Sequence, residues 1–535
     1  MRLTTHSFAR FKTDEARDEP WDAMRLLWCA PPPVPYTRSP MAHRTSEQSR
    51  PATTDAAALD GLGAAVERLV PGLEEFLGAG GPDLAIRDRT AWIAALDRDL
   101  PANGAGVDAV VDELARWVVP YGQRTPDPRF MAYIIGRATT ATLAAGLAAQ
   151  VAGHFRYFLT SFSFLEERSL GWLAELCHIP RDAFGVYSSG GSTANLLAMG
   201  AARQAAFERI GVDASEAGLP SGVRARVYGG TEVHHTIQRA TGVLGLGRRA
   251  FVAVDSDRAG RMDPAALDRR LREDSAASVV PMAIVAVAGT TAAGSIDDLD
   301  AIADVAAEHD VWLHVDGAYG LPAAGLPELA SAFRGVERAD SWIVDPHKWL
   351  GTPAGCGATY VRDGDLLERA FTQEPAPYLE TFSPADARSQ FDSQGIHWYD
   401  RSVELSSPSR GVWVWAALRE IGANGMRERF RRHIGLARHL ADLADAHPRL
   451  ELMLQPTLSI CCFRYRRNGL DEAALDALNT EIVQTLRAEM SLVPSTARIE
   501  GNLAIRACIV NPATTLMEVA ALADSVVSIG DRLSP

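Results

Sequence analysis

Residues 341–352, SWIVDPHKWLGT, place a lysine just behind a short apolar run. The run SWIV is typical of a buried strand, and the following Asp345 and Pro346 indicate that the strand ends there. Lysine is rarely buried without a partner. Lys348 is therefore either an ordinary surface lysine in a turn or an amine held in place to form a Schiff base with a carbonyl compound. The rest of the sequence has to distinguish these two alternatives.

Six further apolar runs surround this stretch, and helical patterns lie between several of them. Short runs rich in β-branched residues, separated by helices and apolar nearly throughout, predict a mainly parallel sheet that is covered on both faces. With SWIV they make seven predicted strands in an α/β fold. The six runs are FGVYSS (184–189), RARVYGG (224–230), RRAFVAVD (248–255), VVPMAIVAVAGT (279–290), VWLHVDGAY (311–319) and GATYVRD (357–363).

Composition changes along the chain predict four parts. Residues 1–55 are rich in Pro, Arg, Ser and Thr and have no sustained period, which predicts a poorly ordered tail. Residues 56–120 carry apolar residues at helical spacing and predict an N-terminal helical arm. We expect the large α/β domain over 121–410, followed by a smaller α+β domain over 411–535.

Bulk properties exclude several functional classes. The 535 residues carry a formal net charge of −14 and a pI of about 5.5, which argues against a general nucleic-acid binder or a polybasic membrane-surface protein. The six cysteines form no CxxC pair and no zinc spacing, so we expect reduced thiols in the cytoplasm. No signal peptide and no apolar run of about 18 residues is evident, so no membrane segment is predicted.

Residues that can carry chemistry follow the predicted strands, and ligands of open α/β sheets bind beyond the carboxyl ends of strands. Gly190, Gly191 and Ser192 lie between a strand and a helix, where glycines allow close approach and free N–H groups attract an anion. Ser192 is equally plausible as a simple helix N-cap. This stretch alone is weak evidence for phosphate binding.

Three other strand ends carry polar side chains, and the residues at two of them can be interpreted in two ways. Asp316 either caps a turn or holds a proton on a heterocyclic nitrogen. One of His234 and His235 is expected to face inward, either as a core residue or as part of a site. The two adjacent histidines also resemble a pair of metal ligands. No third ligand has suitable spacing, so no metal site is predicted. Hydroxyls follow another strand at Thr290 and Thr291.

Taken together, these strand ends supply an anion cradle, an imidazole, a carboxylate and a lysine. One ligand needs all four: it has a phosphate, a flat ring to be stacked, a ring nitrogen to be paired and an aldehyde for an amine. That ligand is pyridoxal 5'-phosphate, and we expect it to be the cofactor.

Five ordered motifs resemble those of the group II pyridoxal-phosphate-dependent amino acid decarboxylases, which include aromatic-amino-acid, tyrosine, histidine and glutamate decarboxylases. The resemblance runs from about residue 125 to the C-terminus and implies the fold type I architecture of pyridoxal-phosphate-dependent transferases. DPHKW is its most specific motif. The motifs are GGSTAN (190–195), TEVHHTIQRA (231–240), AGTTAAGSIDD (288–298), HVDGAYG (314–320) and DPHKWL (345–350).

The resemblance implies a role for each matching residue. Lys348 would form the Schiff base, Asp316 would pair with the pyridine nitrogen and His234 would stack over the ring. The family pattern favours His234 over His235 because Thr236 follows two residues later. Further cofactor contacts are implied for Gly191, Ser192, Thr291, Ala318 and His347.

The family also implies a reaction and an assembly. We expect decarboxylation of an L-amino acid, aromatic or bulky and apolar, to the amine through a quinonoid that Tyr399 protonates. The alternatives are decarboxylation with oxidative deamination to an aldehyde, and a scaffold that binds the cofactor without turnover. A homodimer is implied, because the family's sites lie at the subunit interface. The chain departs from the family pattern at Asp127, where the family has a histidine, and around Ile134 and Gly136, so the substrate pocket is individual.

Overall fold

The computed structural model describes residues 61–78, 89–153, 160–372 and 398–534. The predicted tail, residues 1–55, lies outside this part. Within it, no helix is both long enough and apolar enough to cross a membrane. Five buried cysteines of this part carry free thiols: Cys177, Cys356, Cys461, Cys462 and Cys508.

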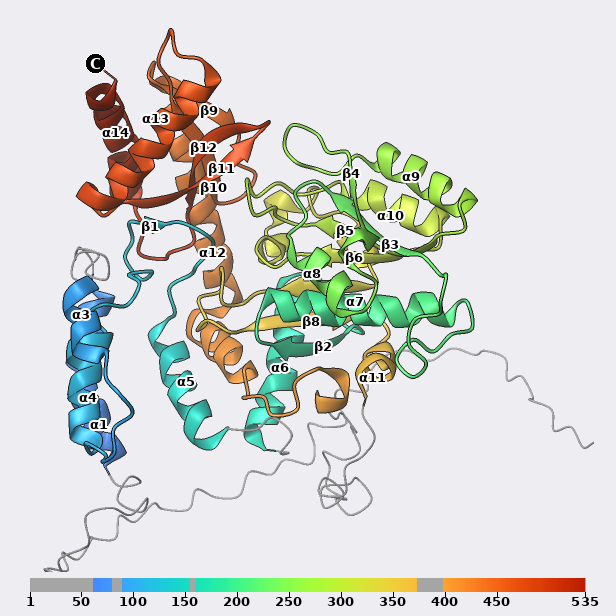
Figure 1. The fold of residues 1–535 in the computed structure, drawn as a ribbon, viewed down its shortest axis with the longest axis horizontal. Coiled ribbons are helices and arrows are strands. Elements are labelled where there is room, and N and C mark those ends of the chain that lie inside the picture. The colour runs from blue at the N-terminus through green and yellow to red at the C-terminus, as the bar shows by residue number, and fades with distance from the viewer. Residues whose placement is uncertain (1–60, 79–88, 154–159, 373–397, 535) are drawn as a thin grey trace, which may run out of the picture. The chain divides into compact units, whose positions relative to one another are not determined.

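A seven-stranded sheet forms the centre of the large α/β part (Figure 1). Its spatial order is β2-β8-β7-β6-β5-β3-β4. Neighbouring strands from β4 to β7 are parallel, and β8 runs antiparallel to both β7 and β2. The predicted mainly parallel sheet is therefore confirmed, and every predicted run contains a strand. The strands are β2 (Phe184–Ser188), β3 (Ala225–Gly230), β4 (Phe251–Val254), β5 (Val280–Val287), β6 (Trp312–Asp316), β7 (Ser341–Val344) and β8 (Gly357–Val361).

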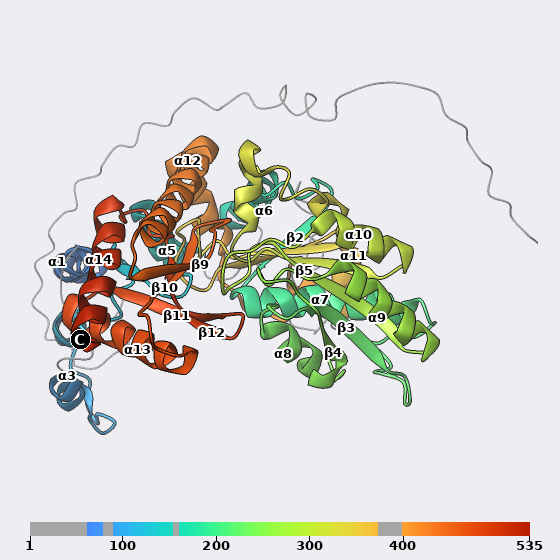
Figure 2. The ribbon, with the colours of Figure 1, turned by 90° about the horizontal axis from the view of Figure 1, so that it is seen from above.

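Helices cover both faces of this sheet (Figures 1 and 2). Helices α7 (Gly191–Glu208) and α8 (Thr236–Val243) pack on one face, whereas α9 (Pro264–Ala276) and α10 (Leu299–Glu308) pack on the other. Right-handed crossovers require this arrangement, because the chain moves outward from β3 to β4 and then returns to β5 and β6. The carboxyl ends of β2, β3, β5, β6 and β7 consequently open on one edge of the sheet.

A second sheet of five strands has the order β1-β11-β12-β10-β9 and its own hydrophobic core with α13 (Glu472–Thr485) and α14 (Leu516–Leu533). Strand β1 pairs in parallel with β11, so residues expected within the large domain contribute to the C-terminal sheet. The two residues of β1 are too few to leave a periodic signal in the sequence. The strands are β1 (Phe130–Met131), β9 (Leu450–Leu454), β10 (Ile460–Tyr465), β11 (Val493–Ile499) and β12 (Asn502–Cys508).

The remaining long helices surround these two sheets. Helix α12 packs against α5 and α6, and Gly422 interrupts it with a φ of 73°. The N-terminal helices α1 and α3 have no buried residue. These helices are α1 (Leu62–Leu77), α3 (Arg89–Leu96), α4 (Val107–Glu113), α5 (Thr140–Ala152), α6 (Ser161–Leu176), α11 (Asp365–Phe371) and α12 (Gly411–Ala446).

Candidate active site

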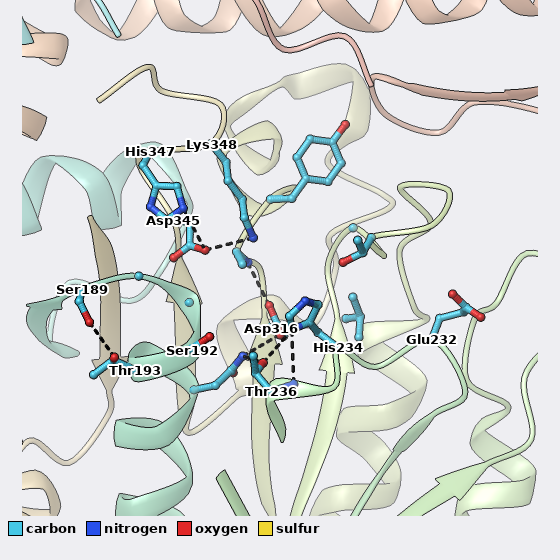
Figure 3. Close-up of a pocket in the computed structure, with 18 residues that line it drawn as sticks. Ser189, Ser192, Thr193, Glu232, His234, Thr236, Asp316, Asp345, His347 and Lys348 are labelled. Atoms are coloured by element: carbon cyan, nitrogen blue, oxygen red, sulfur yellow. Dashed lines mark hydrogen bonds and ion pairs between the residues drawn. The ribbon is translucent and has the colours of Figure 1, made fainter. Parts of the chain in front are cut away.

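A pocket of about 330 Å³ opens at the carboxyl ends of the central strands (Figure 3). This volume is within the range of small-molecule sites. The structure brings nearly all of the predicted site residues to its wall. These are Gly191, Ser192, His234, Thr291, Asp316, Ala318, His347 and Lys348.

An anion cradle lies between β2 and α7. Gly190 has a φ of 131°, which glycine adopts without strain, and the first N–H groups of α7 follow it. A side chain would not fit at the next position, because a Cβ on Gly191 would lie 2.6 Å from Asp345 Oδ2. His347 borders the same space and donates from Nδ1 to the carbonyl oxygen of Cys356 over 2.6 Å. Backbone N–H groups at a helix start suit a phosphate group.

Asp316 ends β6 at the bottom of the pocket. Its Oδ2 accepts from Asn195 Nδ2 over 3.0 Å, and its Oδ1 accepts from the main-chain N–H of Ala318 over 3.2 Å. Two donors stabilise the ionised form of a carboxylate. An anion in this place is suited to accept a hydrogen bond from a protonated ring nitrogen.

The two adjacent histidines lie differently. His234 lines the pocket, and burial lowers its pKa, partly opposed by the charge of Asp316. His235 is exposed and is absent from the pocket wall, although the two ring centroids are only 4.2 Å apart. The hydroxyl of Thr236 lies 2.9 Å from His234 Nδ1. The inward ring is therefore the one that the sequence pattern favoured.

Lys348 enters the pocket from the turn after β7. Its Nζ lies 3.0 Å from Asp345 Oδ2, and the Asp345 side chain is 2% exposed. The neighbouring Trp349 anchors the turn, because its indole donates to His433 Nδ1 over 2.9 Å and its ring stacks on Tyr319. The amine is thus held on a rigid support, as Schiff-base chemistry requires.

Tyr399 is the predicted site residue that the structure does not bring to this pocket. It lies in a short 3-10 helix, Trp398–Arg401, whose Trp398 ring packs against Phe184 at a centroid distance of 5.7 Å. Phe184 begins β2, whereas the pocket lies beyond the other end of that strand. A role of Tyr399 in proton transfer remains a prediction.

Three residues close to the site were missed by the sequence analysis. Asn195 and His314 lie directly behind Asp316, and both stand within motifs in which other residues drew attention. Arg506, in β12, is 3% exposed and donates to the carbonyl oxygens of Thr291 and Ala292. A charged residue in the otherwise apolar run NLAIRACIV was the available signal for Arg506.

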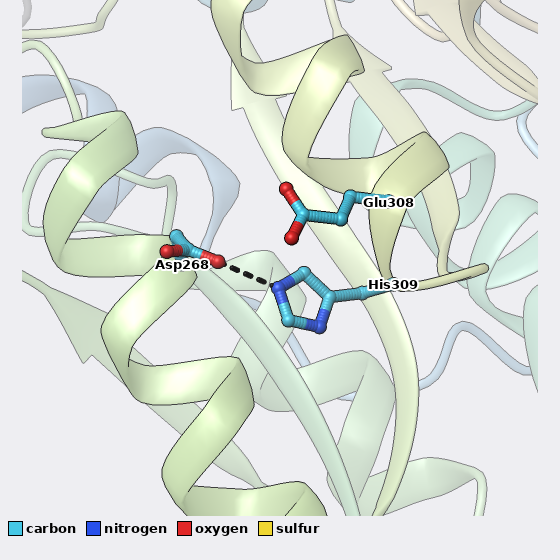
Figure 4. A group of neighbouring side chains, drawn as sticks. All are labelled: Asp268, Glu308 and His309. Carbon is cyan, nitrogen blue, oxygen red and sulfur yellow. Dashed lines mark hydrogen bonds and ion pairs between the residues drawn. The ribbon is translucent and has the colours of Figure 1, made fainter.

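A separate cluster of potential metal ligands lies between α9 and α10 (Figure 4). His309 Nε2 is 2.7 Å from Asp268 Oδ1, and Glu308 lies beside them. The guanidinium of Arg272 pairs with both carboxylates. This arginine supplies the positive charge that a metal ion would bring, so the cluster is an ion-pair network that joins the two helices.

The pocket residues fit pyridoxal phosphate. The α7 cradle suits the phosphate, Asp316 suits a protonated ring nitrogen, and Ala318 and His234 are available on the pocket wall for a flat ring. Lys348 supplies the amine for the aldehyde. Each functional group of the cofactor thus has a chemically matched partner in one pocket.

Comparison with known proteins gives a consistent result. Residues 90–466 match the family model described as the pyridoxal-dependent decarboxylase conserved domain. The chain is 28% identical over 445 residues to an aromatic-L-amino-acid decarboxylase of Bacillus atrophaeus, covering 81% of this chain and 88% of that protein. It is 30% identical over 408 residues to tryptophan decarboxylase 1 of Oryza sativa, covering 72% and 77%.

Solved structures show the same fold. The Oryza sativa structure described as TDC with PLP and tryptamine superimposes with a TM-score of 0.79 at 24% identity, covering 91% of this chain and all of that one. Mouse CSAD superimposes with a TM-score of 0.77 at 24% identity, covering 88% and 99%. At these identities the structural likeness concerns the architecture.

Proposed function

The chain belongs to the pyridoxal-dependent decarboxylases and is a pyridoxal-phosphate-dependent carboxy-lyase of amino acids; we propose that it converts an aromatic or bulky apolar L-amino acid to the corresponding amine. The observation that carries this proposal is the convergence of Lys348, Asp316 and His234 on one pocket. The substrate class is supported by relatives named aromatic-L-amino-acid decarboxylase and tryptophan decarboxylase.

Each residue has a defined task in the proposed reaction. When bound, the cofactor supplies an electron sink for the bond that breaks as carbon dioxide leaves. Asp316 would pair with the protonated ring nitrogen, and the N–H groups of Asn195 and Ala318 hold its two oxygens in place. His234 would lie against the ring, and the N-terminus of α7 would hold the phosphate. Lys348 would supply the amine that holds the aldehyde of the cofactor.

A second outcome on the same scaffold is favoured by two observations. The relatives include a protein of Petunia hybrida named phenylacetaldehyde synthase, 25% identical over 436 residues. In addition, Tyr399 lies outside the pocket of its own chain. In this reaction the amino acid, dioxygen and water yield the aldehyde, carbon dioxide, ammonia and hydrogen peroxide, whereas the simple decarboxylation yields only the amine and carbon dioxide.

One assay separates the outcomes. The purified holoenzyme is incubated with each standard amino acid, and carbon dioxide, amine, aldehyde and hydrogen peroxide are quantified together, with Lys348→Ala as the control for background. Amine equal to carbon dioxide, without peroxide, supports the proposal and identifies the substrate. Aldehyde equal to peroxide supports the second outcome. Failure to release carbon dioxide from any aromatic or apolar amino acid contradicts the proposed substrate class.

We also propose that the protein is a homodimer. Leu143, Leu147 and Val151 stand four residues apart on α5 and are 42%, 46% and 63% exposed, so they form one apolar stripe. Such a stripe is typical of a surface that another chain covers, and a second copy is the partner that the family resemblance implies. Light scattering should give about twice the mass of the chain, and Leu147→Glu should shift it towards the monomer. A wild-type monomer would contradict this proposal.

A further inference from the structure

A buried series of hydrogen bonds runs behind the pocket from Trp312 to His234. The indole Nε1 of Trp312 lies 2.8 Å from Ser341 Oγ, which lies 2.9 Å from His314 Nδ1. His314 Nε2 lies 2.9 Å from Asn195 Oδ1. The amide of Asn195 then reaches both Asp316 and Thr236. Thr236 in turn reaches His234 (Figure 3). The direction of every bond in this series can be derived from the chemistry of its ends.

The first end is an obligate donor. An indole N–H can only donate, so Ser341 Oγ accepts from Trp312. The hydrogen of the Ser341 hydroxyl is then free to point at His314 Nδ1. His314 is completely buried, and burial lowers its pKa to about 4, opposed by Asp316 and the Ser341 main chain. The neutral ring has a single hydrogen, and this end of the series is compatible with a hydrogen on Nε2 but does not by itself place it there, because a hydroxyl can accept two hydrogen bonds.

The other end is an obligate acceptor and determines the tautomer. An ionised carboxylate has no hydrogen to donate, so Asn195 must present Nδ2 to Asp316. Its Oδ1 consequently faces His314 Nε2, which must carry the hydrogen. The carboxylate end thus selects one tautomer of His314 and one orientation of the Asn195 amide, and the indole end is compatible with both.

The same amide is connected to His234 through Thr236, whose main-chain N–H indicates where the proton of His234 lies. Asn195 Nδ2 has a second hydrogen, which points to Thr236 Oγ1 over 3.2 Å. The Thr236 hydroxyl then donates to His234 Nδ1 over 2.9 Å, and the main-chain N–H of Thr236 points to the same nitrogen over 3.4 Å. Since His234 Nδ1 accepts, the hydrogen of the neutral ring lies on Nε2.

We propose that Trp312, Ser341, His314 and Asn195 are positioning residues that set the proton arrangement of the active site, keeping Asp316 as an acceptor and His234 as a donor through Nε2. The consequence for catalysis rests on the proposed function of Asp316 and His234. The proton positions themselves do not, because they follow from the bonding partners alone. All four residues are buried, which favours hydrogen bonds among them over hydrogen bonds to bulk water.

The direct test is nitrogen NMR of the holoenzyme labelled with [15N]histidine, with His314→Gln and His234→Gln variants to assign the signals. The expected result is a single Nε2–H tautomer for both histidines at pH 7.5. An Nδ1–H tautomer of His314, with its hydrogen on the Ser341 main-chain carbonyl, overturns the proposal, as does an Nδ1–H tautomer of His234. This measurement does not depend on turnover, so its failure differs from failure of the decarboxylase proposal.

A matched pair of variants tests the positioning role. Asn195→Leu removes the amide that joins His314 to Asp316, whereas Asn479→Leu removes an equally buried amide in α13 that bonds only to Tyr465 and Leu475. We expect Asn195→Leu to move the pH at which the absorbance of the bound cofactor changes by about one unit, because Asp316 loses a donor. Asn479→Leu should not move it. Equal absorbance titrations of both variants and wild type overturn the proposal.

Discussion

Asp345 Oδ2 lies 3.0 Å from Lys348 Nζ, and this ion pair lies directly beside the anion cradle. The other oxygen of Asp345, Oδ1, is buried and has no hydrogen-bond partner among the described residues. His347 Nε2 lies farther from Asp345 Oδ2, at 3.9 Å, so the ammonium group is the nearer partner. A buried carboxylate is costly once its nearer partner is engaged elsewhere. If Lys348 bonds to the cofactor as proposed, the pair stabilises the cofactor-free enzyme specifically.

Replacing Asp345 with asparagine should strengthen cofactor binding. The substitution removes the partner of the free Lys348 and also removes a negative charge close to the phosphate site, so both effects favour the loaded state. We expect the dissociation constant of pyridoxal phosphate to fall about tenfold, which corresponds to about 1.4 kcal/mol. Equilibrium dialysis of the cofactor measures it.

The control for this prediction is Glu232→Gln, because Glu232 also lines the pocket but has no ion pair with Lys348 among the described contacts. Its effect on the dissociation constant should be smaller. A weaker cofactor affinity in Asp345→Asn would show instead that the carboxyl group of Asp345 contributes to binding.

Arg506 should be essential for the link between the two sheets. Its guanidinium donates to the main-chain carbonyls of Thr291, Ala292 and Tyr133, and it is almost fully buried. Arg506→Gln leaves several of these acceptors without a donor, so we expect a loss of roughly 2–4 kcal/mol in unfolding free energy. Urea denaturation measures this loss.

Arg498→Gln is the comparison for Arg506, because Arg498 lies on the adjacent strand β11 and is largely exposed. Its ion pair with Asp476 is a surface interaction, and its loss should cost at most about 1 kcal/mol. Equal stability losses in the two variants would refute the structural role assigned to Arg506.

The central sheet could be predicted from the sequence because its strands are covered on both faces. Such strands are continuous apolar runs, as in MAIVAVA before Gly289, and the polar residues that follow them stand out. Lys348 and Asp316 were found in this way. Their convergence on one pocket follows from parallel strands, whose carboxyl ends share an edge.

The residues behind the pocket could not be predicted in the same way. Asn195 and His314 are 119 positions apart, and each resembles an ordinary polar residue beside a strand or in a helix. Their significance depends on which donor faces which acceptor, and that is a property of packing. Strand β1 was missed for a different reason, because its two residues are selected by their partner β11.

Tyr399 should complement a chain that lacks Lys348. Tyr399 lies outside the pocket of its own chain, so we predict that it donates its proton in the pocket of a partner chain. Lys348→Ala and Tyr399→Phe proteins should each form little amine. Unfolding and refolding an equal mixture should restore amine formation in mixed dimers, in which one pocket has an intact lysine and receives an intact tyrosine.

The outcome of this mixing experiment is measured as amine relative to aldehyde. Mixed dimers can regain at most one functional site in two. If Tyr399→Phe alone forms amine at the wild-type rate, Tyr399 is not the proton donor. If neither variant complements the other although both are impaired, a tyrosine acting across the interface is refuted.

The stability of the protein should depend on pH through His314. Burial lowers the pKa of His314 from 6.5 to about 4, so the unfolded chain binds a proton in this interval and the folded protein does not. The free energy of unfolding therefore falls as the pH is lowered from 6.5 to 4, by up to roughly 3 kcal/mol for a shift of about 2.5 units. His314→Gln cannot titrate and should lack this component.

The test has to separate His314 from His433, because burial also lowers the pKa of His433. It is therefore the difference in unfolding free energy between wild type and His314→Gln, measured by urea denaturation. That difference should be constant between pH 7 and 8 and should shift in favour of the variant below pH 6; a difference that stays constant down to pH 4.5 would contradict a neutral, buried His314.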